Sequence, residues 1–376
     1  MKTRRIKTIL LFLSTMPFIG IYAQSIYYVS PHASSGGDGS PATPFHIIHE
    51  AVEKARKDKN CTTIYLREGE YILDTPLVLT SADGNDSKEL IIRNYPGEKA
   101  IISSGITLDL KWEKYKNGIM RAAVKGNPVM DMLIVNGDLR SMARYPDYDK
   151  TAVRFNGTSA LATAPERVKK WKNPEGGYLH AMHSHDWGDF HYRITGKNEK
   201  GELQLEGGWQ NNRPMGIHPE NRMVENIFEE LDAPGEWYYD KQEGWLYYYP
   251  LSDENINELV FETPQLKNLI EIAGTSSHPV KNITIEGIEL TQTIRTFMEH
   301  YEPLLRSDWT IYRGGAVIFR GTEKCTLRDC YIHHVGGNGV FFDKYNRNSA
   351  VTGSYLTSIG ASAICFVGDV AGVRSP

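Results

Sequence analysis

A short apolar pattern recurs near the carboxyl end of the chain at a nearly constant spacing. Its copies are Gly315-Ala-Val-Ile-Phe319, Gly339-Val-Phe-Phe342 and Ala363-Ile-Cys-Phe366. The equivalent residues Val317, Val340 and Ile364 lie 23 and 24 residues apart. A fixed period of this size is typical of stacked repeats, each of which buries its apolar face only against its neighbours. Because the units are short alternating strands with no helical pattern between them, the sequence predicts an all-β fold, a right-handed parallel β-helix.

The strand register predicts which side chains face inward. If Val340 and Phe342 point into the stack, then Phe341 and Asp343 point outward, because successive side chains of a strand alternate between its two faces. The predicted outward rows are Ile318, Phe341, Cys365 and Arg320, Asp343, Val367. We expect this outward face to form a long, flat floor suited to an extended ligand.

Residues 1–23 have the pattern of a secretory signal peptide. Four basic residues precede an apolar run from Ile9 to Ile21, and a small residue, Ala23, stands at the expected cleavage point. The run is shorter than the ~20 apolar residues of a membrane-spanning helix. We therefore expect an exported protein, periplasmic or extracellular, with no membrane span in the mature chain.

Charge and cysteine content exclude several classes of protein. The formal net charge is −4, and loss of residues 1–23, which hold four Lys and Arg and no acidic residue, would make it −8. An acidic exported chain is a poor nucleic-acid binder. The chain has four cysteines, three of them within the repeats, where we expect core packing, with a disulfide as the alternative.

The mature chain begins with a strand-like segment, a Gly- and Ser-rich loop and an amphipathic helix. The helix is predicted from Pro44 to Lys57, with Thr43 as its N-cap, and is expected to close the first end of the stack. This opening and the stretch from Ile64 to Tyr71 resemble the start of exported pectin-lyase-like β-helix proteins. Two further stretches, Val135 to Asp147 and Glu229 to Tyr238, resemble the polysaccharide-degrading enzymes around glycoside hydrolase family 141.

The repeat spacing disappears in the middle of the chain, where alternating strands such as Tyr178 to His183 take its place. We therefore predict a signal peptide at 1–23, an N-terminal cap and first coils at 24–108, an inserted β-rich domain at 109–255, and further coils at 256–376. No capping helix or polar strand follows the last coil before Pro376. The sequence therefore predicts a truncated end and the possibility of catalytic coils beyond it.

Glycoside hydrolysis generally uses two carboxyl groups that flank the scissile bond. Three aspartates are candidate catalytic residues: Asp308 in the long loop 295–312, Asp343 on the outward row, and Asp369 beyond the next coil. The alternatives are a ladder ion pair between Asp343 and Arg320, and a turn-stabilising role for Asp369.

A second constellation of polar and aromatic residues runs from His183 to His191. Its ligand spacing does not favour zinc, so we predict no metal there. Sugars need planar polar groups and an aromatic face. The candidate substrate-binding residues are His185, Asp186, Trp187, Trp309, Arg313 and Arg320.

These features predict an exported carbohydrate-active enzyme that hydrolyses glycosidic bonds in a plant-type or other complex polysaccharide without a cofactor. The first alternative is a polysaccharide lyase, which would need a basic residue beside a uronate carboxylate and often Ca²⁺. The second alternative is a glycan-binding β-helix protein without catalytic activity, or an inactive fragment.

Overall fold

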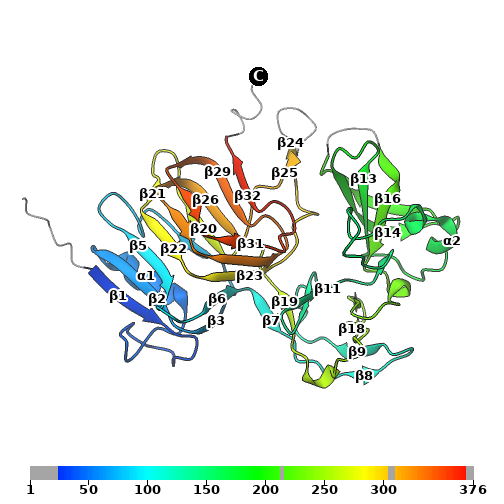
Figure 1. Ribbon diagram of the computed structural model, residues 1–376, viewed down its shortest axis with the longest axis horizontal. Helices are drawn as coiled ribbons and strands as arrows, with labels where there is room; N and C mark the ends of the chain where they lie inside the picture. Colours follow the sequence, from blue (N-terminus) through cyan, green and yellow to red (C-terminus); the bar gives the residue numbers. More distant parts are fainter. Residues whose placement is uncertain (1–23, 212–215, 304–309, 370–376) are drawn as a thin grey trace, which may run out of the picture.

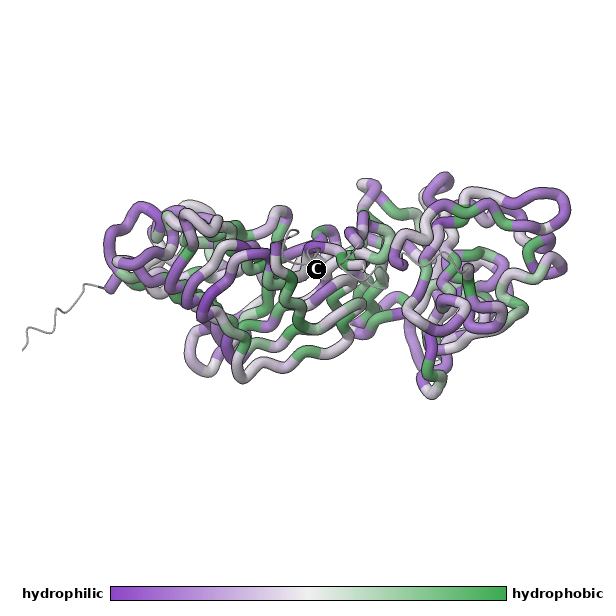
Figure 2. The backbone as a smooth tube through the Cα atoms, turned by 90° about the horizontal axis from the view of Figure 1, so that it is seen from above, coloured by the Kyte–Doolittle hydropathy of each residue, from purple (hydrophilic) through white to green (hydrophobic). Residues whose placement is uncertain are grey.

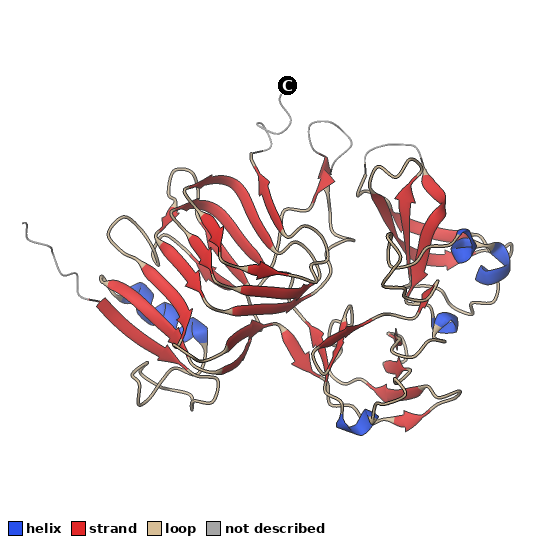
Figure 3. Cartoon of the chain, viewed as in Figure 1, coloured by secondary structure: helices blue, strands red, loops and turns tan. Residues whose placement is uncertain are grey.

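The computed structural model describes residues 24–211, 216–303 and 310–369, and strands dominate it (Figures 1 and 3). Three parallel sheets form the larger part of the molecule. The first coil sheet contains, in spatial order, β1 (Gln24–Val29), β2 (Cys61–Leu66), β5 (Leu90–Asn94), β22 (Ile283–Glu286), β27 (Thr326–Arg328) and β30 (Ala350–Thr352). The second contains β3 (Gly69–Ile72), β6 (Ala100–Ser103), β23 (Glu289–Thr293), β28 (Tyr331–Val335) and β31 (Tyr355–Leu356). The third contains β4 (Leu77–Leu79), β20 (Ile270–Ala273), β26 (Val317–Glu323), β29 (Val340–Arg347) and β32 (Ile364–Val367), with β21 (Val280–Lys281) beside β26.

The chain visits the three sheets in the same order in each successive coil. For example, β27, β28 and β29 follow one another along the chain, and each pairs with the corresponding strand of the next coil, β30, β31 and β32. An all-β molecule built from parallel sheets in this way is consistent with the predicted β-helix. The handedness of the winding stays a prediction.

The predicted strand register is confirmed. Val317 pairs with Val340 and Val340 with Ile364, while Phe341 pairs with Ile318 and Cys365. Val317 and Val340 are fully buried in one core that extends from the first coil to Phe342. Figure 2 shows apolar stretches recurring in adjacent coils. The period-2 pattern therefore fixed both the pairing and the inward face of these strands.

The expectation of an open outward surface at Phe341 is wrong. Ile318, Phe341 and Cys365 face away from the core, yet each is less than a tenth exposed. The guanidinium of Arg313 lies over this face and donates to Asp343 Oδ1 at 2.5 Å and to the carbonyl of Gly368 at 3.0 Å. The chain that leads into β26 therefore covers the outer surface that the strand pattern leaves open.

Helix α1 (Ile48–Lys57) packs its apolar face, including Ile48, Ala51 and Val52, into the coil core. The predicted start at Pro44 is wrong, since Phe45 instead forms an extended bridge to Val29 and exchanges backbone hydrogen bonds with Tyr28 and Ser30. Thr43 is not the N-cap. Its hydroxyl donates to Asp38 Oδ1 at 2.6 Å and closes the preceding loop.

All four cysteines are free, and Cys325, Cys330 and Cys365 are buried. The prediction of core packing is therefore confirmed for Cys325 and Cys330, whereas Cys365 is buried on the outer face of its strand. The burial of their thiols raises the pKa of Cys325 and Cys330 to about 11, which keeps both groups protonated and unreactive.

The chain leaves the coils after β6 and rejoins them at β20, and the intervening region forms three antiparallel sheets. The first contains, in spatial order, β7 (Gly105–Thr107), β19 (Phe261–Pro264), β10 (Leu133–Val135) and β11 (Asp138–Arg140). The second contains β12 (Arg144–Tyr145), β16 (Ile217–Glu225), β13 (Tyr178–His183), β14 (Asp189–Lys197) and β15 (Leu203–Gly207). The third contains β17 (Trp237–Asp240), β18 (Trp245–Tyr248), β9 (Met120–Ala123) and β8 (Glu113–Lys114). The short helix α2 (Pro165–Val168) and the strand pair β24 (Glu302–Pro303) and β25 (Thr310–Ile311) complete the described elements beyond single turns of 3₁₀ helix. The division of the chain at residues 109 and 255 stays a prediction.

No helix within the described part of the chain is both long and apolar enough to cross a membrane. The proposed signal peptide, residues 1–23, lies outside the described residues.

Candidate functional site

A cleft of about 1560 Å³ lies between the inserted strands and one corner of the coils. On the coil side it is lined by Arg295 to Phe297, by His334 to Gly336 and by Ser358 to Ala361, which lie at or just after the ends of β23, β28 and β31 in the second coil sheet. Phe155 and His334, both lining residues, have left-handed backbone with φ of 47° and 49°. Side chains of this size rarely adopt that conformation, and such residues cluster at functional sites.

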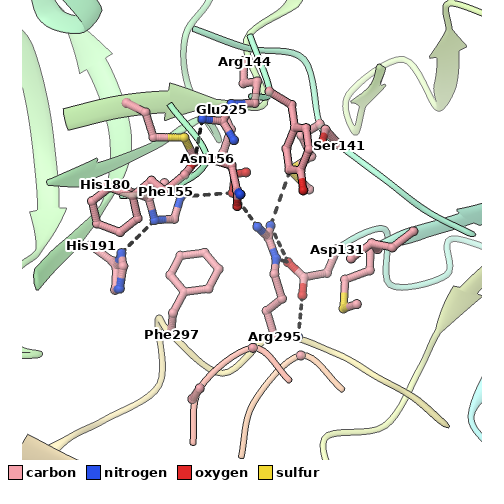
Figure 4. Close-up of a pocket in the computed structure, with 18 of the residues that line it drawn as sticks. Asp131, Ser141, Arg144, Phe155, Asn156, His180, His191, Glu225, Arg295 and Phe297 are labelled. Atoms are coloured by element: carbon pink, nitrogen blue, oxygen red, sulfur yellow. Dashed lines mark hydrogen bonds and ion pairs between the residues drawn. The ribbon is translucent and has the colours of Figure 1, made fainter. Parts of the chain in front are cut away.

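Arg295 stands at the centre of the cleft and binds two carboxylates of the inserted region (Figure 4). Its Nε and Nη2 donate to Asp131 Oδ1 at 3.0 and 2.9 Å, its backbone N–H donates to Asp131 Oδ2 at 2.7 Å, and its Nη1 donates to Glu225 Oε1. Burial alone would raise the pKa of Glu225, but the charge of Arg295 and the hydrogen bond from His180 hold that pKa well below its usual value. Glu225 is therefore an ionised carboxylate, and the guanidinium is shared between two carboxylates.

A pair of histidines continues this network from Glu225 toward the cleft opening. His180 Nε2 lies 3.0 Å from Glu225 Oε1, and its Nδ1 lies 2.7 Å from the Nδ1 of His191. Burial lowers the pKa of His180, so this ring is neutral near neutral pH. Because it donates from Nε2 to an ionised carboxylate, its Nδ1 must accept from His191. His191 Nε2 in turn lies 3.4 Å from Asp189, so β13, β14 and β16 together position one continuous polar chain.

A third carboxyl group, Glu236, has the opposite environment. It lines the cleft, is 3% exposed, and its Oε1 has no hydrogen-bond partner. Burial, together with the negative charges of Asp147 and Asp232, raises the pKa of Glu236 to about 8. Glu236 is therefore a neutral acid at neutral pH, and the exposed Asp147 beside it also lines the cleft.

The position of Glu236 follows from how two stretches of chain meet. Trp237 is fully buried and forms a bridge with Met142, and the backbone N–H of Ala143 donates to the carbonyl of Trp237 at 2.7 Å. The segments that contain Asp147 and Glu236 are thereby held side by side. These are the two stretches in which the sequence resembles polysaccharide-degrading enzymes.

Aromatic side chains stand at the rim of the cleft. Tyr148 and Trp187 line it and are each 54% exposed. The indole of Trp187 is parallel to the His183 ring within 6°, with ring centroids 5.9 Å apart. An exposed aromatic face held in a fixed orientation is well suited to packing against the apolar face of a sugar ring.

The structure separates the residues that the sequence proposed for the site. Asp186 and Trp187 line the cleft, and His185 is exposed beside Trp187 with ring centroids 5.6 Å apart. Asp308 and Trp309 lie outside the described residues, and Asp369 is exposed on the last described coil.

Asp343 is not among the cleft-lining residues. It is 2% exposed and forms ion pairs with Arg313 at 2.5 Å and with Arg320 at 2.7 Å, and Arg313 also binds Glu302. The ladder ion pair considered as the alternative for Asp343 and Arg320 is therefore present. In this position all three side chains are part of the covered outer face of β26 and β29.

Sequence reasoning passed over Glu236, Asp147 and Arg295. The first two lie within the stretches on which the resemblance depends, which is the available signal for them. For Arg295 the signal was its position at the start of a long loop that leaves a regular scaffold. The burial of Glu236, the ion pairs of Arg295 and the position of Asp147 beside Glu236 come from the fold.

Among residues 24–211, 216–303 and 310–369, no group of three or more His, Cys, Asp and Glu side chains is arranged to hold a metal ion.

One solved structure has a similar fold. A solved structure described as a glycoside hydrolase superposes with a TM-score of 0.72 at 20% identity over 88% of this chain and 65% of its own. A complex of XylC with xylose covers 84% of this chain and 41% of its own at a TM-score of 0.42, an overlap too low to establish a shared fold.

Among curated proteins, the uncharacterized protein YwoF of Bacillus subtilis (strain 168) is 34% identical over 88 residues. This match covers 23% of the present chain and 17% of YwoF. The chain thus spans less than two thirds of the length of either the similar glycoside hydrolase or YwoF. No protein-family model matches the sequence.

Proposed function

We propose that this protein is a glycoside hydrolase whose substrate binds in the cleft between the coils and the inserted strands. The observation that carries the proposal is the pair formed by Glu236 and Asp147. One carboxyl group is buried and stays protonated, and the other is exposed and lies close enough for its charge to raise the pKa of the first. Carboxyl groups whose environments separate their pKa values are the acid and base of glycosidic cleavage.

In the proposed mechanism Glu236 donates its proton to the glycosidic oxygen as the bond from that oxygen to the anomeric carbon breaks. The exposed Asp147 acts as the second carboxyl group, either by removing a proton from the attacking water or by attacking the anomeric carbon before water releases the sugar. The net reaction adds one water molecule across the bond. Neither role requires a metal ion.

Two further observations support a carbohydrate substrate. The rim residues Tyr148 and Trp187 offer exposed aromatic faces, and a fold of this kind occurs in a glycoside hydrolase. We also infer that the protein is exported and acts on a polysaccharide or oligosaccharide, because residues 1–23 have the pattern of a signal peptide.

The test is an assay of hydrolysis on a panel of polysaccharides, in which the rate is measured as the release of reducing ends. We expect Glu236→Gln and Asp147→Asn each to reduce the rate by about 10²- to 10⁴-fold while leaving the protein folded. Asp369→Asn, which alters a carboxylate proposed from the strand register, serves as the matched control and should retain full activity. Unchanged activity in Glu236→Gln, or its loss in Asp369→Asn, would overturn the assignment.

A further inference from the structure

Every arginine among the described cleft-lining residues already binds protein groups. Arg295 is shared between Asp131 and Glu225, and Arg140 pairs with Glu254 at 2.8 Å. Arg144 is 5% exposed and donates to the backbone carbonyls of Pro146, Phe155 and Gly157 at 2.7 to 3.0 Å. None of the described lining residues is a lysine. Arg154, near the rim, pairs with Asp186 at 2.7 Å.

The histidines among the described lining residues are also engaged by protein groups. Burial lowers the pKa of both His180 and His334, so these imidazoles are neutral near neutral pH. His191 has its Nε2 beside Asp189, so a proton bound there is directed at a carboxylate of the protein.

With the neutral Glu236 left out, six carboxyl groups face three guanidinium groups among the described lining residues, so this lining is acidic. Several of these carboxylates face solvent: the side chains of Asp138 and Asp189 are 76% and 44% exposed, and Asp147 is exposed as well. A cleft lined mainly by one sign of charge concentrates its field and repels ligands of the same sign. A buried ligand carboxylate would in addition lose its hydration without gaining a charged partner.

From this charge distribution we infer that the cleft selects neutral glycans and rejects uronate-rich or sulfated ones. The inference rests on the proposed function and narrows its substrate class. It also opposes elimination chemistry, because a lyase must neutralise the uronate carboxylate beside the proton that it removes, and no described cation of the cleft is available for that.

The test uses matched polymers. A neutral polysaccharide that the protein cleaves or binds is partly oxidised at its primary hydroxyl groups, which creates carboxylates on the same backbone. Binding is measured by affinity electrophoresis and cleavage by reducing ends, at low and high salt. We expect binding and rate to fall at least about 10-fold on oxidation at low salt, with part of the loss recovered at high salt because salt screens the repulsion.

Two charge-reversal variants test whether the discrimination against the oxidised polymer arises from the charge of the cleft. Asp138→Lys places a cation at the cleft and should reduce the difference in binding and cleavage rate between the neutral and the oxidised polymer. Asp109→Lys makes the same change in net charge at a side chain that is also 76% exposed but does not line the cleft, and it should leave the difference unchanged.

The outcomes separate the two proposals. Equal or tighter binding of the oxidised polymer, or ultraviolet-absorbing unsaturated products, would overturn the inference of a neutral substrate. Preferential binding of the neutral polymer without any cleavage would support this inference and contradict the proposed hydrolase.

Discussion

Glu236 is a carboxyl group for which the fold provides almost no compensation. Its Oε1 is buried without a partner, and its neighbours Asp147 and Asp232 are negative. An arrangement that only had to be stable would place a glutamine or an apolar residue here. Perturbed carboxyl groups in a cleft are therefore the first candidates for proton transfer.

The activity should depend on pH through Glu236. Since this group must be protonated to act, and its pKa is about 8, activity should fall as pH rises through that value. Asp232→Asn removes a neighbouring negative charge and should move the fall to lower pH. A pH–rate profile of kcat/KM for the two proteins checks this, and coincident profiles would argue against Glu236 as the acid.

Glu236 should also make the free energy of unfolding depend on pH. The folded pKa of Glu236 is above the ordinary value of 4.5, so its contribution is fully present below about pH 4.5 and is lost as pH rises through about 8. At about 1.4 kcal/mol per pKa unit, this amounts to a few kcal/mol. Urea unfolding at pH 5 and pH 9 measures this. Between these pH values the free energy of unfolding should decline less for Glu236→Gln than for the unaltered chain, and an identical decline would contradict the expected burial.

Trp187 should contribute to binding and not to stability. Its indole is half exposed and is oriented by the His183 ring. We expect Trp187→Ala to weaken glycan binding by on the order of 1 kcal/mol, or several-fold in KM, with little change in kcat or melting temperature. Trp187→Phe, which keeps an aromatic face, should recover part of the loss. A change confined to kcat would contradict a stacking role.

The turn that follows β23 connects the coils to the inserted region at the cleft. Arg295 in this turn binds Asp131, which lies just before β10, and Glu225 at the end of β16. One guanidinium thus links a coil to two separate sheets of the inserted region. Three elements distant in sequence depend on this single side chain.

Removal of that side chain should be costly. Arg295→Gln leaves two buried carboxylates without their cation, which typically destabilises a protein by roughly 3–5 kcal/mol. The loss should be largest near neutral pH and diminish in acid, because the stabilisation from the depressed pKa of Glu225 is full above its ordinary value of 4.5 and declines as pH falls below that value. Denaturant unfolding measures both effects. Lys125→Gln, which removes the exposed pair with Asp109, is the control and should cause no measurable change.

The elements differ in how far the sequence determines them. The strands from Val317 to Val367 follow from a period-2 pattern repeated at 23 to 24 residues, so their pairing and inward face were predictable. The covering of Phe341 and the ion pair between Asp343 and Arg313 were not, because Arg313 lies outside the repeat. The ion pair between Asp343 and Arg320 had been considered as an alternative. The start of α1 was misplaced for a similar reason: the pairing of Phe45 with Val29 overrides the local helix signal of Pro44.

The candidate site was less predictable than the coils. It combines side chains from 131 to 361 in the sequence, and their roles depend on burial and mutual pairing. Asp186 and Trp187 could be selected because polar and aromatic residues are clustered there. Glu236 carries no local pattern that separates it from the exposed acids nearby, and its raised pKa arises only when the surrounding strands assemble.

At the scale of the whole molecule, the coils depend on continuous columns of side chains. Phe319, Phe342 and Phe366 stack in one column, with ring centroids 4.6 and 4.4 Å apart. Phe342 is 2% exposed, whereas Phe366, on the last described strand, is 72% exposed. The same residue type therefore occupies two different environments one coil apart.

This difference gives a paired prediction. Phe342→Ala should destabilise the fold by roughly 3–5 kcal/mol, since it opens a cavity in the middle of the column. Phe366→Ala should cost much less, because its ring is already mostly in solvent. Thermal and denaturant unfolding of the two variants measure the contrast. Equal losses would mean that Phe366 is covered in solution.

The inserted region leaves and rejoins the coils at one place. Strands β7 and β19, its first and last, are hydrogen-bonded neighbours, with Gly105 opposite Pro264 and Thr107 opposite Glu262. A segment whose two ends are adjacent can be lengthened, shortened or replaced without redirecting the scaffold that carries it. One wall of the cleft can therefore change in length or sequence while the strand pairing of the coil wall stays the same.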